Sequence, residues 1–345
     1  MDNREKEILE YVREHPLGSS RNIFEGVNLE ISYATVKRIL AHLITQQLVG
    51  TEGRGKGTKY VISPHYNLFY PIDLEQYFVQ EIDERQIQND FDLRLISDLG
   101  RIASLFTDSE IAHLNKLQSQ YQQNVSELST SEYIRELERL AIDLSWKSSQ
   151  IEGNTYSLLE TERLLKEKET AEGKSKDEAT MLLNHKEAID FLIEHPDYLD
   201  PLTMANIADL HSILIKNLGI SRGIRTTRVG ISGTNYRPLD NEFQIREAIR
   251  DMCALINGKS IVFDKALLAL VLISYIQPFG DGNKRTGRIV SNAILMNNGY
   301  CPLSFRTVAS VEYKKAMLVF YEQNNISSFK ELFMEQFEFA VETYF

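Results

Sequence analysis

Residues 275–288 read Y-I-Q-P-F-G-D-G-N-K-R-T-G-R. An apolar run, residues 264–276, leads into this stretch, and a second one, residues 289–296, follows it. Pro278 cannot continue the first helix, because it has no backbone N–H and its ring clashes with the preceding turn. The pattern predicts a helix, a short loop and a second helix that begins near Asn283.

The loop between these helices has the composition of an anion site. Gly280 and Gly282 allow backbone angles and close approaches that larger residues resist. The first N–H groups of the second helix have no partner inside it, and together with the helix dipole they favour an anion. Asp281 adds a carboxylate for a phosphate-bound Mg²⁺. Cations for phosphate oxygens follow at Lys284, Arg285 and Arg288. The residues alone predict a nucleotide-phosphate site.

The same stretch resembles the core motif of the Fic family, H-x-F-x-(D/E)-G-N-(G/K)-R-x-x-R. The resemblance implies that Asp281 holds the metal ion and that the backbone of residues 282–284 cradles the phosphates of ATP. It assigns catalysis to Gln277, which stands at the position of the family's histidine, and to Asn283 and Arg285. The implied nucleotide-binding residues are Phe279, Gly280, Gly282, Asn283, Lys284, Arg285, Arg288 and Tyr313.

Gln277 is the one departure from this motif. Fic enzymes bind ATP with Mg²⁺ and transfer AMP to a Ser, Thr or Tyr hydroxyl of a protein, and their histidine accepts the hydroxyl proton. A glutamine amide does not titrate near neutrality, so it cannot serve as a general base. Loss of a base costs about 10²–10⁴-fold in rate. We therefore expect nucleotide binding with weak or absent AMP transfer.

The helix predicted over residues 131–153 ends in S-S-Q-I-E-G. A carboxylate in the last turn of a helix faces the unfavourable end of the dipole, so Glu152 requires a cationic partner. This ending is similar to the inhibitory motif of Fic proteins, (S/T)-x-x-x-E-(G/N), through Ser148, Glu152 and Gly153. The resemblance implies that Glu152 pairs with Arg288 and blocks the site of the γ-phosphate. Without the core motif, a plain helix end would be the simpler interpretation.

Residues 223–239 carry a hairpin signal, because Thr and Val alternate with polar residues before Ser232-Gly233. The segment resembles the Fic flap, a hairpin that covers the active site and pairs with an extended segment of the target protein. The target-docking candidates are Val229, Ile231 and Gly233. An ordinary surface hairpin is the alternative.

After the core motif, residues 311–317 resemble the helix that lines the base pocket in this family. Tyr313 matches a tyrosine found there, whereas Lys314 stands where a second aromatic residue is common. Residues 320–345 are rich in aromatic residues and predict core or a homodimer surface. His185 and His211 lie in helical patterns, and we expect both to serve packing.

Residues 1–64 predict three short helices followed by two strands with a glycine-rich basic tip. This order resembles a winged helix-turn-helix domain. The segment holds nine Lys and Arg against eight Asp and Glu, whereas the whole chain has a net charge of -11. A recognition helix and a wing would contact duplex DNA through Lys37, Arg38, Arg54, Lys56 and Lys59. A winged helix used for protein contacts is the alternative.

The 345 residues predict a mainly α protein, a Fic helical bundle with a β-hairpin flap and an N-terminal winged helix domain. The expected domains are residues 1–64, a connecting region at 65–130 that is mostly helical from residue 81, and the Fic domain at 131–345. Two cysteines give neither a disulfide framework nor a zinc spacing. The charged start is unlike a signal peptide, and no apolar run would span a membrane. We expect a cytoplasmic protein.

Three functions are compatible with these patterns. The first is a Fic protein adenylyltransferase, autoinhibited by Glu152 and impaired at Gln277, whose substrate is itself or a DNA-associated protein. The second is a non-enzymatic regulator that joins a nucleotide-sensing Fic fold to a DNA-binding winged helix. The third is a phosphotransferase of the Doc type. The Asp281-Gly282 pair and the inhibitory helix argue against the third function.

Overall fold

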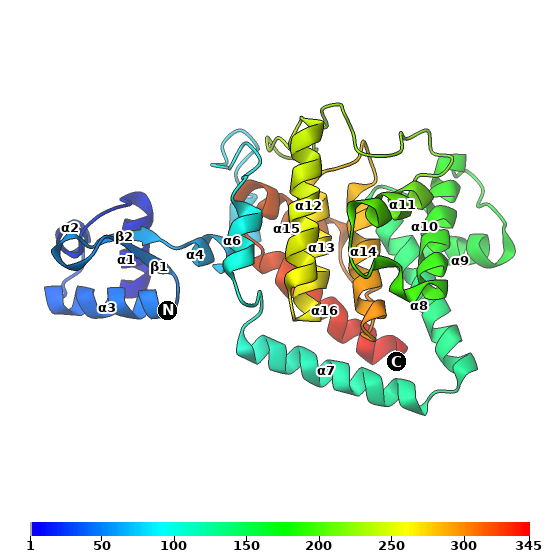
Figure 1. Cartoon of the computed structure of the whole chain (residues 1–345), viewed down its shortest axis with the longest axis horizontal. Coiled ribbons are helices and arrows are strands. Elements are labelled where there is room, and N and C mark those ends of the chain that lie inside the picture. Colours follow the sequence, from blue (N-terminus) through cyan, green and yellow to red (C-terminus); the bar gives the residue numbers. More distant parts are fainter. Residues whose placement is uncertain (1) are drawn as a thin grey trace. The chain divides into compact units, whose positions relative to one another are not determined.

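The structure is a computed structural model that describes residues 2–345, with Lys56 described by its backbone alone. It is mainly helical, as predicted (Figure 1). The chain divides into two compact units. The first comprises Met1–Asp73 with Gln323–Ser327, and the second comprises Leu74–Glu322 with Ser328–Phe345.

The first unit has the predicted order of three helices and two strands. Ser19 and Ser32 accept hydrogen bonds from the first turns of the second and third helices, which fixes where these helices begin. The strands pair antiparallel, with Val49 opposite Ile62. The elements are α1 (Asn3–Glu14), α2 (Ser20–Gly26), α3 (Tyr33–Thr45), β1 (Val49–Glu52), the short 3₁₀ turn η1 (Gly55–Gly57), β2 (Lys59–Ile62) and α4 (Pro64–Phe69).

The basic side chains predicted to contact DNA lie on the outside of this unit. Lys37 and Arg38 are exposed on α3, Arg54 is exposed before η1, and Lys59 is exposed at the start of β2. The side chain of Lys56 lies outside the described residues. Their apolar neighbours on α3 face inward and join the core of the unit, which includes Ile8, Val12, Ile23, Val36, Ile39, Leu40 and Leu43.

The second unit is a helical bundle around α13 (Val262–Ile276). Every residue of α13 from Phe263 to Ile276, except Lys265, is buried, as expected for a helix that is apolar on all sides. The other elements are α5 (Leu74–Tyr77), α6 (Leu95–Arg101), α7 (Asp108–Glu127), α8 (Thr130–Ile151), α9 (Leu158–Glu167), α10 (Lys176–Glu194), η2 (Pro196–Leu199), α11 (Met204–Leu214), α12 (Glu242–Gly258), α14 (Asn283–Asn297), α15 (Ser310–Gln323) and α16 (Ser327–Tyr344).

The closest packing in the bundle is between α13 and α14, which lie side by side (Figure 1). A Cβ atom placed on Gly287 of α14 would lie 2.9 Å from the carbonyl oxygen of Leu270 on α13. Glycine is therefore needed at this position to let the two helices approach. Since these helices flank the loop of residues 277–282, their approach fixes where that loop begins and ends.

Two predictions about local structure are wrong. The hairpin predicted for residues 223–239 does not form; the segment is an extended loop between α11 and α12, and β1 and β2 are the only paired strands among residues 2–345 (Figure 1). Its backbone groups bond elsewhere, as when the Arg237 amide donates to the Asn89 carbonyl at 2.7 Å. Residues 81–94, predicted as mostly helical, instead form turns and irregular backbone, and the Asn89 carbonyl is one of the partners that they supply to the flap.

Among residues 2–345, every helix is too short or too polar to cross a membrane.

Replacing Gly287 by valine tests the close approach of the two helices. The new side chain would meet the Leu270 carbonyl, so we expect the free energy of unfolding to fall by about 2–3 kcal/mol. Gly258 is exposed at the end of α12 with nothing within 4 Å of its would-be Cβ. Gly258→Val should therefore change stability by less than about 0.5 kcal/mol. Calorimetry compares the two; equal losses would contradict the packing argument.

Candidate functional site

The loop between α13 and α14 begins at a left-handed residue. Gln277 caps α13 with φ 52° and ψ 58°, and its amide donates to the Ile273 carbonyl at 3.1 Å. The side chain of Asn283 then fixes the loop: its Oδ1 accepts from the Phe279 amide, and its Nδ2 donates to the Phe279 carbonyl and to Gln277 Oε1, each at 2.9 Å. Asn283 thus holds the shape of the loop.

His211 supports the loop from α11. Its ring stacks on Phe279 with centroids 3.7 Å apart, which agrees with the packing role expected from the sequence. Its Nε2 also lies 2.9 Å from the Asp281 carbonyl oxygen. Burial lowers the pKa of His211 to about 4, although this hydrogen bond opposes the shift. The imidazole is therefore neutral near pH 7, and Nε2 carries the proton that it donates to Asp281.

Arg225 is a buried side chain that the sequence analysis missed. Its Nε donates to the Gln277 carbonyl at 2.6 Å, and its other nitrogens donate to the carbonyls of Thr227 and Leu239. Its own amide donates to the Pro278 carbonyl at 3.0 Å. One guanidinium thus joins both ends of the flap, the name we keep for residues 223–239, to the start of the loop.

Glu152 ends α8 between two cations. Its Oε1 lies 2.7 Å from Arg288 Nη2 and its Oε2 lies 3.0 Å from Lys284 Nζ. Burial of the carboxyl opposes its ionisation, but the charges of Arg288 and Lys284 outweigh that effect and lower the pKa of Glu152 to about 2. Arg288 Nε also donates to Ser148 Oγ at 2.8 Å. Gly153 follows with φ 100°, a left-handed conformation that ends the helix.

Arg288 lies behind this carboxylate and is fully buried. Its guanidinium stands over the ring of Tyr313 at 5.0 Å, a cation–π arrangement within the bundle. A buried charge without a partner is costly, so the carboxylate of Glu152 and the oxygens of Ser148 stabilise it.

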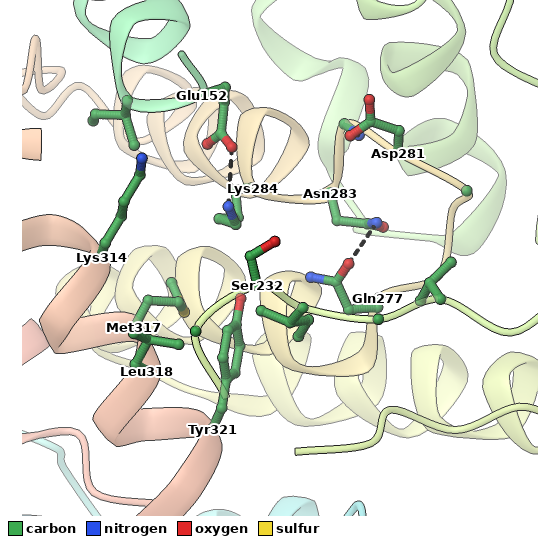
Figure 2. A pocket seen from close by; sticks show the side chains of 17 residues that line it. Glu152, Ser232, Gln277, Asp281, Asn283, Lys284, Lys314, Met317, Leu318 and Tyr321 are labelled. Carbon is green, nitrogen blue, oxygen red and sulfur yellow. Dashed lines mark hydrogen bonds and ion pairs between the residues drawn. The ribbon is translucent and has the colours of Figure 1, made fainter. Parts of the chain in front are cut away.

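A cavity of about 510 Å³ opens in front of the loop (Figure 2). The loop and Glu152 form its charged end, whereas α15 contributes a mostly apolar wall. Figure 2 shows the hydroxyl of Ser232 directed into the cavity from the flap. The lining residues are Ile151, Glu152, Val229, Gly230, Ile231, Ser232, Gly233, Gln277, Gly280, Asp281, Gly282, Asn283, Lys284, Lys314, Met317, Leu318 and Tyr321.

The structure brings only part of the predicted site to this cavity. Six predicted residues do not line it: Ser148, Gly153, Phe279, Arg285, Arg288 and Tyr313. Arg285 is buried with its Nη1 donating to the Leu214 carbonyl at 3.3 Å, so it braces α14 against the end of α11. Residues 311–317 were predicted to line the base pocket, and Met317 does line the cavity, whereas Leu318 and Tyr321 were not predicted as part of the site. The sequence signal for this wall of the cavity is the aromatic and apolar character of the helix after the motif. The same character is equally typical of a helix that packs in the hydrophobic core.

The start of α14 presents unoccupied donors to the cavity. Gly282 caps the helix with φ 80° and offers no side chain to its first N–H groups. The amides of residues 283–285 are therefore available to an anion, and the helix dipole favours one there. Lys284 adds a positive charge at the same place.

Asp281 supplies a carboxylate on this loop, with Oδ1 accepting from the Gly282 amide at 2.6 Å. Within residues 2–345, no group of three or more His, Cys, Asp or Glu side chains is arranged to hold a metal ion. A single carboxylate fits Mg²⁺, because this ion commonly takes one or two protein oxygens and completes its shell with phosphate and water. The loop could not hold a metal that needs a full set of protein ligands.

Comparison with known families shows that residues 201–295 match the Fic/DOC family. The chain therefore contains a Fic/DOC family domain, as its core motif indicated. It is 29% identical over 181 residues to protein adenylyltransferase fic-1 of Caenorhabditis elegans, covering 49% of this chain and 34% of that protein. Protein adenylyltransferase Fic of Aedes aegypti is 29% identical over 168 residues, covering 46% and 32%. The matched region thus spans about a third of these relatives.

Solved structures share the fold. Residues 134–508 of Fic-1 from C. elegans superpose with a TM-score of 0.59 at 23% identity, covering 68% of this chain and 72% of that one. A Fic family protein from Desulfovibrio desulfuricans gives a TM-score of 0.60 at 19% identity, covering 70% and 75%. The second unit therefore has the Fic fold.

The ion pairs of Glu152 predict a pH dependence of stability. Its pKa falls from 4.5 to about 2 on folding, so the carboxylate stabilises the fold fully above about pH 4.5 and loses this effect as the pH falls toward 2. The shift corresponds to at most about 3 kcal/mol. The difference in unfolding free energy between the unmodified protein and Glu152→Gln should be constant above about pH 5 and shrink below it.

Glu187→Gln is the matched control, because Glu187 pairs with Lys216 at 2.8 Å in an exposed position. The Glu187→Gln substitution should change the free energy of unfolding by less than about 1 kcal/mol at every pH. Urea unfolding at several pH values measures both. A Glu152→Gln difference that persists unchanged at pH 2 would contradict the assignment.

Proposed function

We propose that the charged end of the cavity binds the polyphosphate of Mg·ATP and that Glu152 competes with it. The observation that carries this proposal is the carboxylate of Glu152 held at 2.7 Å from Arg288 and 3.0 Å from Lys284. A carboxylate and a phosphate offer similar oxygens to such donors. Removal of Glu152 frees both cations for a terminal phosphate next to the uncapped amides of α14.

The remaining residues complete a nucleotide site. Asp281 would hold Mg²⁺ together with phosphate oxygens, and the ion would supply positive charge at this end of the cavity. The apolar wall of Met317 and Leu318 takes the base, and the cavity volume of about 510 Å³ is in the range of small-molecule sites. The flap lies across this cavity with Val229 and Ile231 in its lining, where it guides an extended segment of a protein target.

The reaction that this site supports is AMP transfer to a protein hydroxyl, since the relatives are named protein adenylyltransferases. The hydroxyl oxygen bonds to the α-phosphorus, pyrophosphate leaves, and the hydroxyl proton needs an acceptor. Gln277 supplies none: its Nε2 donates to the Ser274 carbonyl at 2.6 Å and its Oε1 accepts from Asn283 at 2.9 Å. Both ends of its amide hold the loop, so transfer is weak.

Incubation of the full chain with ATP labelled on the α-phosphate tests this function. Gln277→His combined with Glu152→Gly should label the protein itself or an added target about 10²–10⁴-fold faster than Glu152→Gly alone. Gln277→Ala with Glu152→Gly is the matched control: alanine also lacks a base, so its labelling rate should not exceed that of Glu152→Gly alone.

Glu152→Gly should by itself bind Mg·ATP more tightly than the unmodified protein in calorimetry. An absence of heat with Glu152→Gly would refute nucleotide binding.

A second function is favoured by the exposed cations of the first unit. The first unit has three helices and an antiparallel two-stranded sheet, in the order of a winged helix-turn-helix. Lys37 and Arg38 are exposed on its third helix, Arg54 between the two strands and Lys59 at the start of β2. Such an arrangement suits duplex DNA. We propose that the chain acts at DNA, either as an enzyme with a DNA-associated substrate or as a nucleotide-sensing regulator. Label that is absent in every variant favours the regulator.

DNA binding predicts a salt dependence that these side chains set. Each phosphate contact contributes about 0.9 to the slope of log affinity against log salt concentration. Replacing Lys37 and Arg38 together by alanine should lower that slope by about 1.8, whereas Lys116→Ala on α7 should leave it unchanged. Fluorescence anisotropy with a mixed-sequence duplex measures the slope. Equal slopes for all three proteins would exclude α3 as the DNA-contacting helix.

A further inference from the structure

Residues 83–90 contact the far limb of the flap, residues 235–237. The Arg237 amide donates to the Asn89 carbonyl at 2.7 Å, and Arg237 forms a parallel bridge with Asp90. Side chains extend the pairing, since Asn235 Nδ2 donates to Asp83 Oδ1 at 3.0 Å. One backbone bridge and one side-chain hydrogen bond thus join this part of the chain to the far limb of the flap.

Arg85 anchors the flap from the middle of this segment. Its Nη2 donates to the Gly233 carbonyl at 2.7 Å, and its Nη1 lies 3.3 Å from Oε2 of Glu322, with both side chains buried. Glu322 also accepts a hydrogen bond from the Tyr77 hydroxyl at 2.7 Å. The guanidinium lies 5.1 Å from the ring of Phe78. A buried ion pair with these partners fixes the position of one flap carbonyl.

The anchored carbonyl belongs to a residue that shapes the cavity. Gly233 has φ 90°, and a Cβ on it would lie 3.4 Å from Leu318 on α15. Arg85 therefore sets the distance between the flap and the apolar wall of the cavity. Arg225 holds the two ends of the flap in the same manner, through carbonyl oxygens.

Residues 229–232 lie between these anchors. In the described part of the chain their backbone amides form no hydrogen bond, and all four residues line the cavity. Arg237 in the far limb is already paired with the chain's own segment, and the Tyr236 amide donates to Thr234 Oγ1. Residues 229–232 are thus a stretch of the flap beside the cavity that is open to another extended chain.

We propose that Arg85 is a positioning residue for the flap: it holds the far limb against residues 83–90 and leaves residues 229–232 open to a protein target. The part of this proposal that assigns residues 229–232 to a protein target rests on the proposed function. The anchor itself does not, because its contacts involve neither nucleotide nor target.

Hydrogen exchange of the full chain, followed by mass spectrometry, tests the anchor without any activity. In Arg85→Met, the two hydrogen-bonded amides of the far limb, those of Tyr236 and Arg237, should exchange about tenfold faster, the factor expected when local opening loses one charged hydrogen bond. Exchange in α13 and α14 should be unchanged. Arg85→Lys keeps the charge but lacks the planar guanidinium that reaches both Gly233 and Glu322. Its flap exchange rate should therefore lie between those of the unmodified protein and Arg85→Met.

Two further variants keep the test decisive. Arg85→Met with Glu322→Gln removes both buried charges, so faster flap exchange there cannot come from an unpaired carboxylate. Lys315→Met removes a cation of α15 that pairs with exposed Glu75, and it should leave flap exchange unchanged. Unchanged flap exchange in the double variant, or acceleration that spreads through α13 and α14, would overturn the positioning role. Failure of the labelling assay would leave this result unaffected.

Discussion

The contact between Glu152 and Arg288 is the constraint on which the site depends. Arg288 is fully buried on α14, and a buried guanidinium is stable only with oxygen partners. Those partners come from the end of α8, a helix that lies well over a hundred residues earlier in the chain. The same contact joins two helices and occupies the donors at the charged end of the cavity. Packing of the bundle and access to the site therefore depend on the same interaction.

The loop that faces this carboxylate is held by side chains that bind backbone groups. Asn283 bonds to both polar groups of Phe279, His211 donates to the Asp281 carbonyl, and Arg225 donates to the Gln277 carbonyl. None of these contacts requires a ligand. The loop is therefore shaped before any phosphate arrives, which limits the ordering that binding would demand.

Local patterns were sufficient for much of the fold. Ser19, Ser32 and Pro278 mark helix boundaries through chemistry that acts within a few residues, and the uniform apolarity of α13 predicts its burial. The core motif places Asp281, Gly282, Asn283 and Lys284 at the cavity for the same reason, since they follow one another on a single turn.

Partners that are distant in sequence could not be predicted in this way. Arg85 and Arg225 bind carbonyl oxygens, which every residue offers, so no spacing indicates their targets. The flap was predicted as a hairpin because Thr and Val alternate with polar residues in its sequence. Its backbone groups instead pair with residues 83–90 and with the loop. The bond from Arg285 to the Leu214 carbonyl is another partner of this kind, because on the first turn of α14 the Arg285 side chain points toward α11.

The left-handed conformation of Gln277 has an evolutionary consequence. Histidine is one of the few side chains that occupies this backbone region with some frequency, so the turn would accept it without rearrangement. Either glutamine codon becomes a histidine codon by a change in its third base. A chain of this kind can therefore gain or lose its proton acceptor by one nucleotide substitution, while the turn and the helix after it keep their shape.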